Sequence, residues 1–129
     1  MKKITFSLAF LMLTVFVLPG FMTPQDSAIK VKFPKKVDSI IQNKCYGCHS
    51  PEGRSQKAKN KLNWDELTTL DMATQLQKVE AIQKVLREGT MPPKGMIERN
   101  PDMKISDEES AKLEKWANKL HRKISRKMP

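Results

Sequence analysis

The chain has 129 residues, enough for one domain, and carries 24 Lys and Arg against 14 Asp and Glu, a net charge of +10. This charge favours acidic partners or an anionic membrane surface. The two cysteines, Cys45 and Cys48, lie within one pentapeptide, so a bond between them would be a redox site rather than a structural staple.

The N-terminal segment differs in composition from the rest of the chain. Lys2 and Lys3 precede a mostly apolar run from Ile4 to Val17, the pattern of an export signal. Counted on to Met22, the apolar run has 19 residues, about enough to span a bilayer. We therefore expect residues 1–28 to be a signal peptide or an N-terminal membrane anchor, followed by one domain at residues 29–129.

The same segment sets the expected location. It contains no cysteine, which excludes a lipoprotein anchor. The expected location is the periplasm, or the periplasmic face of the inner membrane for an anchored chain. Export argues against a nucleic-acid partner. Residues 29–129 hold 22 basic and 13 acidic residues, which points to partners with acidic faces or to a membrane surface.

The first part of the domain is predicted to be a tether and a short helix. Residues 25–33 have the composition of a tether, and Pro34 suits the first turn of a helix. Val37, Ile40 and Ile41 recur at helical spacing and lead to Cys45. After residue 50 the sequence is polar and basic as far as residue 61, where we expect a loop.

For the rest of the domain we predict two helices, then a loop, then a final helix. Asn63 with Glu66 forms a capping box for a short helix, and Asp71 can cap a longer helix that ends at Gly89. Residues 90–105 are rich in proline and glycine, which predicts a loop. A second capping box, Ser106 with Glu109, opens the final helix. The apolar positions of the two long helices are Leu76, Val79, Ile82, Val85, Leu86, Leu113, Trp116, Ala117, Leu120 and Ile124. The predicted fold is all-α.

The pentapeptide Cys45-Tyr46-Gly47-Cys48-His49 is the most informative feature of the sequence. Its Cys-x-x-Cys-His spacing is that of a covalent c-type haem site. In such a site the thiols of Cys45 and Cys48 bond one porphyrin, and His49 is the proximal ligand of the iron. A thioredoxin-like dithiol would need a βαβ context, and no strand pattern surrounds the pentapeptide.

Met91 is the candidate for the second axial ligand. It begins Met91-Pro92-Pro93, a stretch whose prolines limit backbone freedom. Met/His ligation raises the reduction potential of a haem. Other candidates are Met96 and Met103 in the same loop, Met72 as a core residue, and His121, which we expect on the surface. A Met91 that merely packs in the core is the alternative interpretation.

The composition is consistent with a bound porphyrin. The domain has four aromatic side chains for its core, Phe33, Tyr46, Trp64 and Trp116. A domain with so few large apolar side chains is only marginally stable if burial of its own apolar surface is all that holds it together. One covalent haem c would fill its interior.

Taken in this order, the motifs resemble the class I c-type cytochromes. The similarity is greatest to the small bacterial secreted haem-binding domain family, through the pentapeptide, the Met91-Pro92-Pro93 loop and a final helix with Leu113 and Trp116. It covers residues 34–120. The resemblance implies a small helical bundle around one covalent haem, with the first and last helices crossing, Cys45 and Cys48 as attachment points, and His49 and Met91 as axial ligands. Two features depart from the class: the first helix lacks the usual glycine and aromatic pair, and the stretch after His49 is unusually basic.

The expected function is electron transfer with other redox proteins. An iron with both axial positions filled has no site for oxygen or peroxide. No paired acid and base residues accompany an open site, so we expect the protein not to be an enzyme such as a peroxidase. The first alternative is a haem-based sensor or small-ligand binder in which Met91 binds the iron weakly. A haem-free thiol redox or copper-binding protein is a further alternative.

Overall fold

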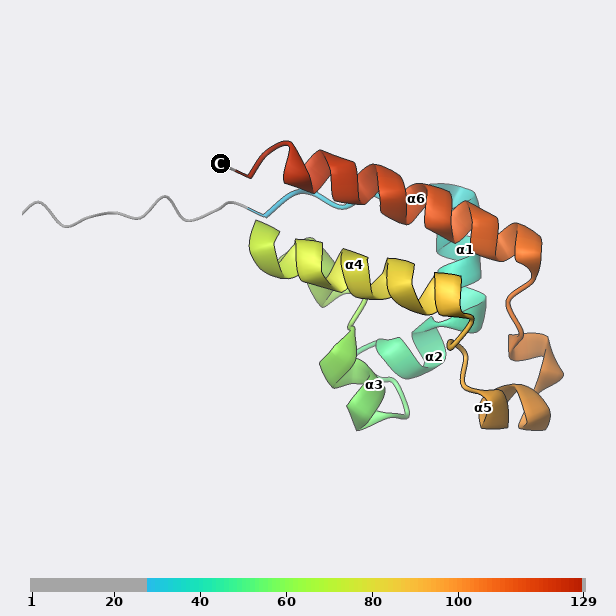
Figure 1. Cartoon of the computed structure of the whole chain (residues 1–129). Coiled ribbons are helices and arrows are strands. Elements are labelled where there is room, and N and C mark those ends of the chain that lie inside the picture. Colours follow the sequence, from blue (N-terminus) through green and yellow to red (C-terminus); the bar gives the residue numbers. More distant parts are fainter. Residues whose placement is uncertain (1–27, 129) are drawn as a thin grey trace, which may run out of the picture.

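The computed structural model describes residues 28–128, whose regular secondary structure is helical, with no β-strand (Figure 1). The predicted all-α fold is confirmed. Within these residues no helix is long and apolar enough to cross a bilayer. The predicted signal peptide or anchor at residues 1–28 lies, apart from Ala28, outside the described residues.

Three longer helices form where capping residues and apolar stripes predict them. Helix α1 spans Lys35–Lys44, α4 spans Met72–Glu88 and α6 spans Asp107–Ser125. Asp71 caps α4 by accepting a hydrogen bond from the backbone of Thr74 at 2.9 Å, and Gly89 ends it with a φ of 58°. Both hydrogen bonds of the Ser106–Glu109 capping box are present at the start of α6.

The main core lies between α1, α4 and α6. Helices α4 and α6 run side by side in opposite directions, and α1 crosses α6 (Figure 1). Two exposed side-chain hydrogen bonds join α4 and α6. The amide of Gln83 donates to the Asn118 side-chain oxygen at 2.5 Å, and His121 Nε2 lies 3.2 Å from the Glu80 carboxylate. The core side chains contributed by the three helices are Val37, Ile40, Ile41, Met72, Val79, Ile82, Leu113, Trp116, Ala117, Leu120 and Ile124.

An aromatic cluster extends this core. The rings of Phe33, Trp64 and Trp116 have centroids 5.5–6.0 Å apart. The indole N–H of Trp116 donates to the carbonyl of Lys32 at 3.0 Å. The cluster joins α6 to two segments that have no regular structure of their own.

The predicted tether is wrong for residues 28–33, because these residues are part of the core. Ile29 and Val31 are buried. The side chain of Gln75, fully buried on α4, accepts from the Ile29 N–H at 3.0 Å and donates to the carbonyls of Ile29 and Leu67, each at 2.9 Å. The alternation of Ile29, Val31 and Phe33 is the signal that this extended segment has one buried side.

Two predicted loops contain short helices. Helix α3, Gln56–Lys61, lies in the basic stretch and is capped by Ser55, while α5, Lys94–Arg99, and the 3₁₀ turn η2, Pro101–Met103, lie in the proline-rich stretch. The helix expected after Asn63 is only a 3₁₀ turn, η1, at Glu66–Thr68. None of α3, α5 or η2 contains a buried residue, so these elements have no apolar periodicity for a sequence pattern to detect.

Candidate functional site

The pentapeptide Cys45–His49, here called the CxxCH turn, follows directly from α1. Cys45 ends α1 by donating its N–H to Ile41 at 2.9 Å. The single helical turn α2, Tyr46–His49, comes next, with the N–H groups of Cys48 and His49 both donating to the Cys45 carbonyl at 3.1 Å. The turn thus brings Cys45, Cys48 and His49 together. Both thiols are free and partly buried.

The segment Leu62–Asp65 holds the CxxCH turn through hydrogen bonds. The His49 Nδ1 lies 3.0 Å from the Leu62 carbonyl oxygen, and the Trp64 N–H donates to the His49 carbonyl at 2.9 Å. Because a carbonyl can only accept, Nδ1 must carry the proton, which leaves Nε2 of the neutral ring as the free ligand atom. The hydroxyl of Tyr46 donates to the carboxylate of Asp65 at 2.9 and 3.0 Å, and this bond raises the Tyr46 pKa.

Two glycines near the CxxCH turn have different surroundings. A Cβ on Gly53 would lie 2.5 Å from the Cys48 carbonyl oxygen and 2.9 Å from that of Ser50, so the loop packs too closely on the turn for any side chain. A Cβ on Gly47 would meet nothing within 4 Å. No contact within residues 28–128 therefore accounts for a glycine at position 47.

The Cys45 thiol lies in a setting unlike that of a redox dithiol. Burial raises the pKa of Cys45 to about 12, with smaller contributions from Glu109 and Cys48. Reactive cysteines of redox motifs have lowered pKa values, because the thiolate is the nucleophile. The haem-free Cys45 therefore stays protonated at neutral pH. The contribution of Glu109 also places the N-terminus of α6 near the CxxCH turn.

Met91 lies in the connection between α4 and α5. Its side chain is 40% exposed, whereas the following Pro92 is buried and joined to it by a cis peptide bond. The Lys44 ammonium, next to Cys45, donates to the Asp102 carbonyl and so links the end of α1 to the α5–η2 region. Among residues 28–128, no hydrogen bond joins Met91 to the CxxCH turn.

The other candidate ligands are placed as follows. Met72 is buried at the start of α4, as expected for a core residue. Met96 and Met103 are partly buried in α5 and η2. His121, expected on the surface, is partly exposed on α6 and pairs with Glu80. Across the described part of the chain, no group of three or more His, Cys, Asp or Glu residues could hold a bare metal ion.

A hollow of about 490 Å³ opens next to the segment that holds His49. It shares Leu62 with that segment, but none of Cys45, Cys48, His49 or Met91 lines it. It therefore does not by itself place a porphyrin. The lining residues are Pro51, Gln56, Lys59, Asn60, Leu62, Asn63, Glu66, Leu70, Thr74 and Lys78.

The side chains around the CxxCH turn fit a haem. They offer two thiols on one turn and an imidazole whose Nε2 is free. In addition, the indole Nε1 of Trp64 is buried without a hydrogen-bond partner in residues 28–128. A buried donor of this kind is costly unless it is paired, and a haem propionate is an acceptor that could pair it.

The sequence interpretation missed the residues that hold the CxxCH turn. Leu62 acts through its backbone carbonyl, which no residue type can indicate. Tyr46 and Asp65 are joined across a loop, and only the polar hydroxyl of an aromatic residue inside the pentapeptide hints at a bond. Trp64 is expected among the aromatic side chains of the core, and its unpaired N–H emerges only from the packing.

Comparison with known proteins identifies the family. The family model described as a haem-binding domain matches residues 55–119, just over half of the 129 residues. The match begins after the CxxCH turn and includes Met91. No curated protein and no solved structure matches the chain. The chain belongs to the haem-binding domain family, and haem is its cofactor.

Proposed function

We propose that the protein is an exported c-type cytochrome that transfers electrons. One haem is attached covalently through Cys45 and Cys48, His49 binds the iron through Nε2, and Met91 is the second axial ligand. The observation that carries this proposal is the contact of 3.0 Å between His49 Nδ1 and the Leu62 carbonyl. Iron-ligating histidines commonly donate their other ring N–H to a carbonyl in this way, which fixes the tautomer and the ring orientation.

The chain's own residues would set the properties of the redox centre. A bound haem supplies a one-electron couple. The bond to Leu62 keeps the His49 ring aligned and increases its basicity as a ligand. A methionine opposite His49 favours the reduced iron and raises the potential. If His49 and Met91 both bound the iron, the haem would serve electron transfer rather than the binding of oxygen or peroxide.

Basic residues near the CxxCH turn support docking of acidic redox partners. Helix α3, which packs against α2, carries Lys57, Lys59 and Lys61, and Arg54 precedes it. Lys57, Lys61 and Arg54 are exposed. Opposite charges on two redox proteins accelerate their encounter more than they tighten the complex. We therefore place the docking face for an acidic partner on α3.

The exposure of Met91 supports a second candidate function. Met91 is 40% exposed, so the surrounding residues enclose its thioether only in part. If Met91 bound the iron weakly, a small ligand such as CO could replace it, and the protein would act as a haem-based sensor or ligand binder. The binding of the porphyrin and the role of His49 are the same in both candidates.

The absorption spectrum of the oxidised and reduced protein tests these proposals. The protein should be produced in a host that attaches haem to exported chains. We expect a c-type haem spectrum, a mass increase of one haem that survives denaturation, the weak long-wavelength band of a methionine–iron bond, and no change on adding CO. CO binding without that band would replace electron transfer by the second candidate. A colourless exported product would contradict both candidates.

A further inference from the structure

The outward side of α6 carries a stripe of cations. Lys115, Lys119, Arg122 and Arg126 follow one another at spacings of four, three and four residues, which places them on one side of the helix. All four are exposed, and the buried residues of α6, such as Trp116 and Leu120, lie on the opposite side. From residue 115 to residue 127 the chain contains six Lys or Arg and no Asp or Glu.

The segment 28–34 adds to this stripe. Its Lys32 carbonyl accepts the hydrogen bond of Trp116, so the segment lies along α6, and the side chains of Lys30 and Lys32 are exposed. We call Lys30, Lys32, Lys115, Lys119, Arg122 and Arg126 the basic face.

The acidic residues nearest to the basic face are engaged elsewhere or lie on another side. Glu80 of α4 pairs with His121 on the flank of α6, and Glu108 pairs with Lys112 near the N-terminus of α6. Glu114 lies next to Ser110 on the flank that faces α4. The positive charge of the basic face is therefore not neutralised by ion pairs within residues 28–128.

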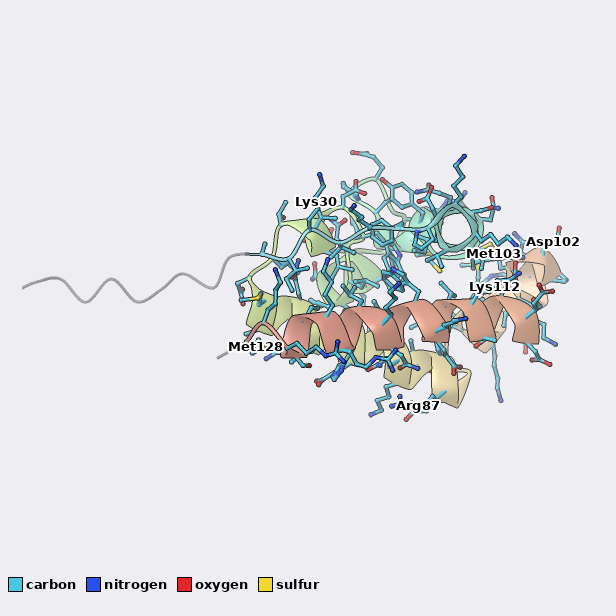
Figure 2. The ribbon with its side chains drawn as sticks, turned by 90° about the horizontal axis from the view of Figure 1, so that it is seen from above. Lys30, Arg87, Asp102, Met103, Lys112 and Met128 are labelled. Carbon is cyan, nitrogen blue, oxygen red and sulfur yellow. The ribbon has the colours of Figure 1, made fainter. Side chains whose placement is uncertain are left out.

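The basic face lies away from the CxxCH turn. Figure 1 shows α6 and the segment before α1 on one side of the molecule, with α2, α3 and α5 on the other. Figure 2 shows Lys30 of the basic face at one end of the molecule, while Asp102 and Met103 of η2 lie at the opposite end, where Asp102 accepts the hydrogen bond of Lys44, the residue before Cys45. The face is thus separate from the α3 surface proposed for redox partners.

The sequence before the described residues indicates what the basic face meets. The apolar run from Ile4 to Met22 precedes it, and only residues 23–27 separate that run from Ala28. A segment able to enter a bilayer therefore joins the domain at the edge of a surface of unpaired cations. Juxtamembrane Lys and Arg are attracted to anionic headgroups, and each contributes to binding near the surface.

We propose that the basic face binds the phosphate headgroups of an anionic bilayer. In this orientation α6 lies along the membrane surface, and the CxxCH turn and α3 face away from it, open to soluble redox partners. This goes beyond the proposed electron transfer, because it holds whichever ligand occupies the sixth position of the iron.

Vesicle flotation of the haem-loaded full chain tests the proposal. Vesicles of phosphatidylcholine alone are compared with vesicles that also contain phosphatidylglycerol. An apolar segment retained in the protein would enter both alike, so the difference between them reports the basic face. We expect stronger partitioning, by about tenfold or more, to the anionic vesicles, with the difference removed by high salt.

Two variants with equal charge loss locate the effect. Lys115→Gln, Lys119→Gln, Arg122→Gln and Arg126→Gln together should lose most of the preference for anionic vesicles, about tenfold in partitioning. Arg54→Gln, Lys57→Gln, Lys61→Gln and Lys104→Gln together should retain it. Circular dichroism and the haem spectrum check that both variants are folded.

Two results would overturn the proposal. In the first, the two variants partition alike, so that only net charge matters. In the second, the wild type binds both kinds of vesicle equally but binds polyglutamate through the α6 cations, which would assign the basic face to an acidic protein.

Discussion

The two sides of this molecule are held together by different forces. Helices α1, α4 and α6 each bury several apolar side chains, whereas α2, α3 and α5 bury none. The first side, here the core side, forms its own interior. The second, here the cofactor side, is held by hydrogen bonds such as those of His49 and Tyr46. We therefore expect the cofactor side to depend on the haem for its apolar burial.

Replacing His49 by Ala should have the largest effect on the protein. It should destabilise the cofactor side while leaving the core side folded. Without its imidazole ligand the protein should fail to retain haem in its normal ligation, and the bond to Leu62 is lost as well. In the haem-free variant we expect amides of α2, α3 and α5 to exchange rapidly, while those of α4 and α6 stay protected. Hydrogen exchange followed by mass spectrometry measures this. Equal protection on both sides would contradict the comparison.

Trp116→Ala tests the core side. The substitution removes a buried ring from the aromatic cluster and the bond to Lys32, and should lower the free energy of unfolding by about 3–5 kcal/mol. The loss should be similar with and without haem, as chemical denaturation can show. Lys115→Ala, an exposed neighbour on α6, is the control. A loss confined to the haem-loaded protein would mean that Trp116 belongs to the cofactor side.

Gln75→Leu tests the attachment of residues 28–33 to the core. The Ile29 N–H and the carbonyls of Ile29 and Leu67 all lose their partner, so we expect a loss of roughly 2–4 kcal/mol in unfolding free energy. The amide of Ile29 should also exchange faster. Gln77→Leu, at an exposed position of α4, should change neither quantity. Unaltered exchange at Ile29 would show that the segment is held by other contacts.

Met91→Ala should change the reduction potential and ligand binding of the haem iron but not the stability of the fold. The side chain is 40% exposed, so little packing is lost and the free energy of unfolding of the haem-free chain should change by less than about 0.5 kcal/mol. The reduction potential should fall, and the reduced protein should bind CO. Potentiometry and CO difference spectra provide the measurement, with Met103→Ala as the matched methionine control. If potential and spectrum stay the same, Met91 is not a ligand.

Tyr46→Phe should have the smallest effect, and it has a definite pH dependence. The bond to Asp65 raises the Tyr46 pKa, so its contribution to stability is present below the ordinary tyrosine pKa of 10.0 and is lost as pH rises through the raised value. The variant should melt roughly a degree or two lower at pH 7. Above the raised pKa of Tyr46, wild type and variant should converge. A difference that persists at high pH would assign the effect to packing.

The sequence predicts the core side well because its signals are local. The caps at Asp71 and Ser106, the glycine at position 89 and the apolar stripes all lie within a few residues of the helices they define. The missed elements lack such signals. Helices α3 and α5 have no buried face, and the burial of Ile29 depends on Gln75, 46 residues away.

The candidate site likewise contains residues that local sequence predicts and residues that only the tertiary structure reveals. The spacing of Cys45, Cys48 and His49 is a local signal, and the structure places them on one turn, although covalent attachment remains a prediction. Leu62, Trp64 and Asp65 contact that turn only because the chain folds back on it. Such contacts depend on tertiary structure, which residue types alone do not specify. Met91 as an iron ligand also stays a prediction.

The close packing of Gly53 on Cys48 bears on where this protein tolerates changes in length. The loop from His49 to Gly53 is closed by hydrogen bonds from Gly53 to Ser50 at 2.9 Å and from Arg54 to Gly47 at 3.2 Å. An inserted residue there would push on the Cys48 carbonyl and displace the Cys48 sulfur, which we propose is bonded to the porphyrin. Helix α3 has no buried residue, so an insertion there disturbs less packing than one in the loop that Gly53 closes. Extra residues engineered into this protein are therefore better placed between positions 56 and 61 than between positions 49 and 53.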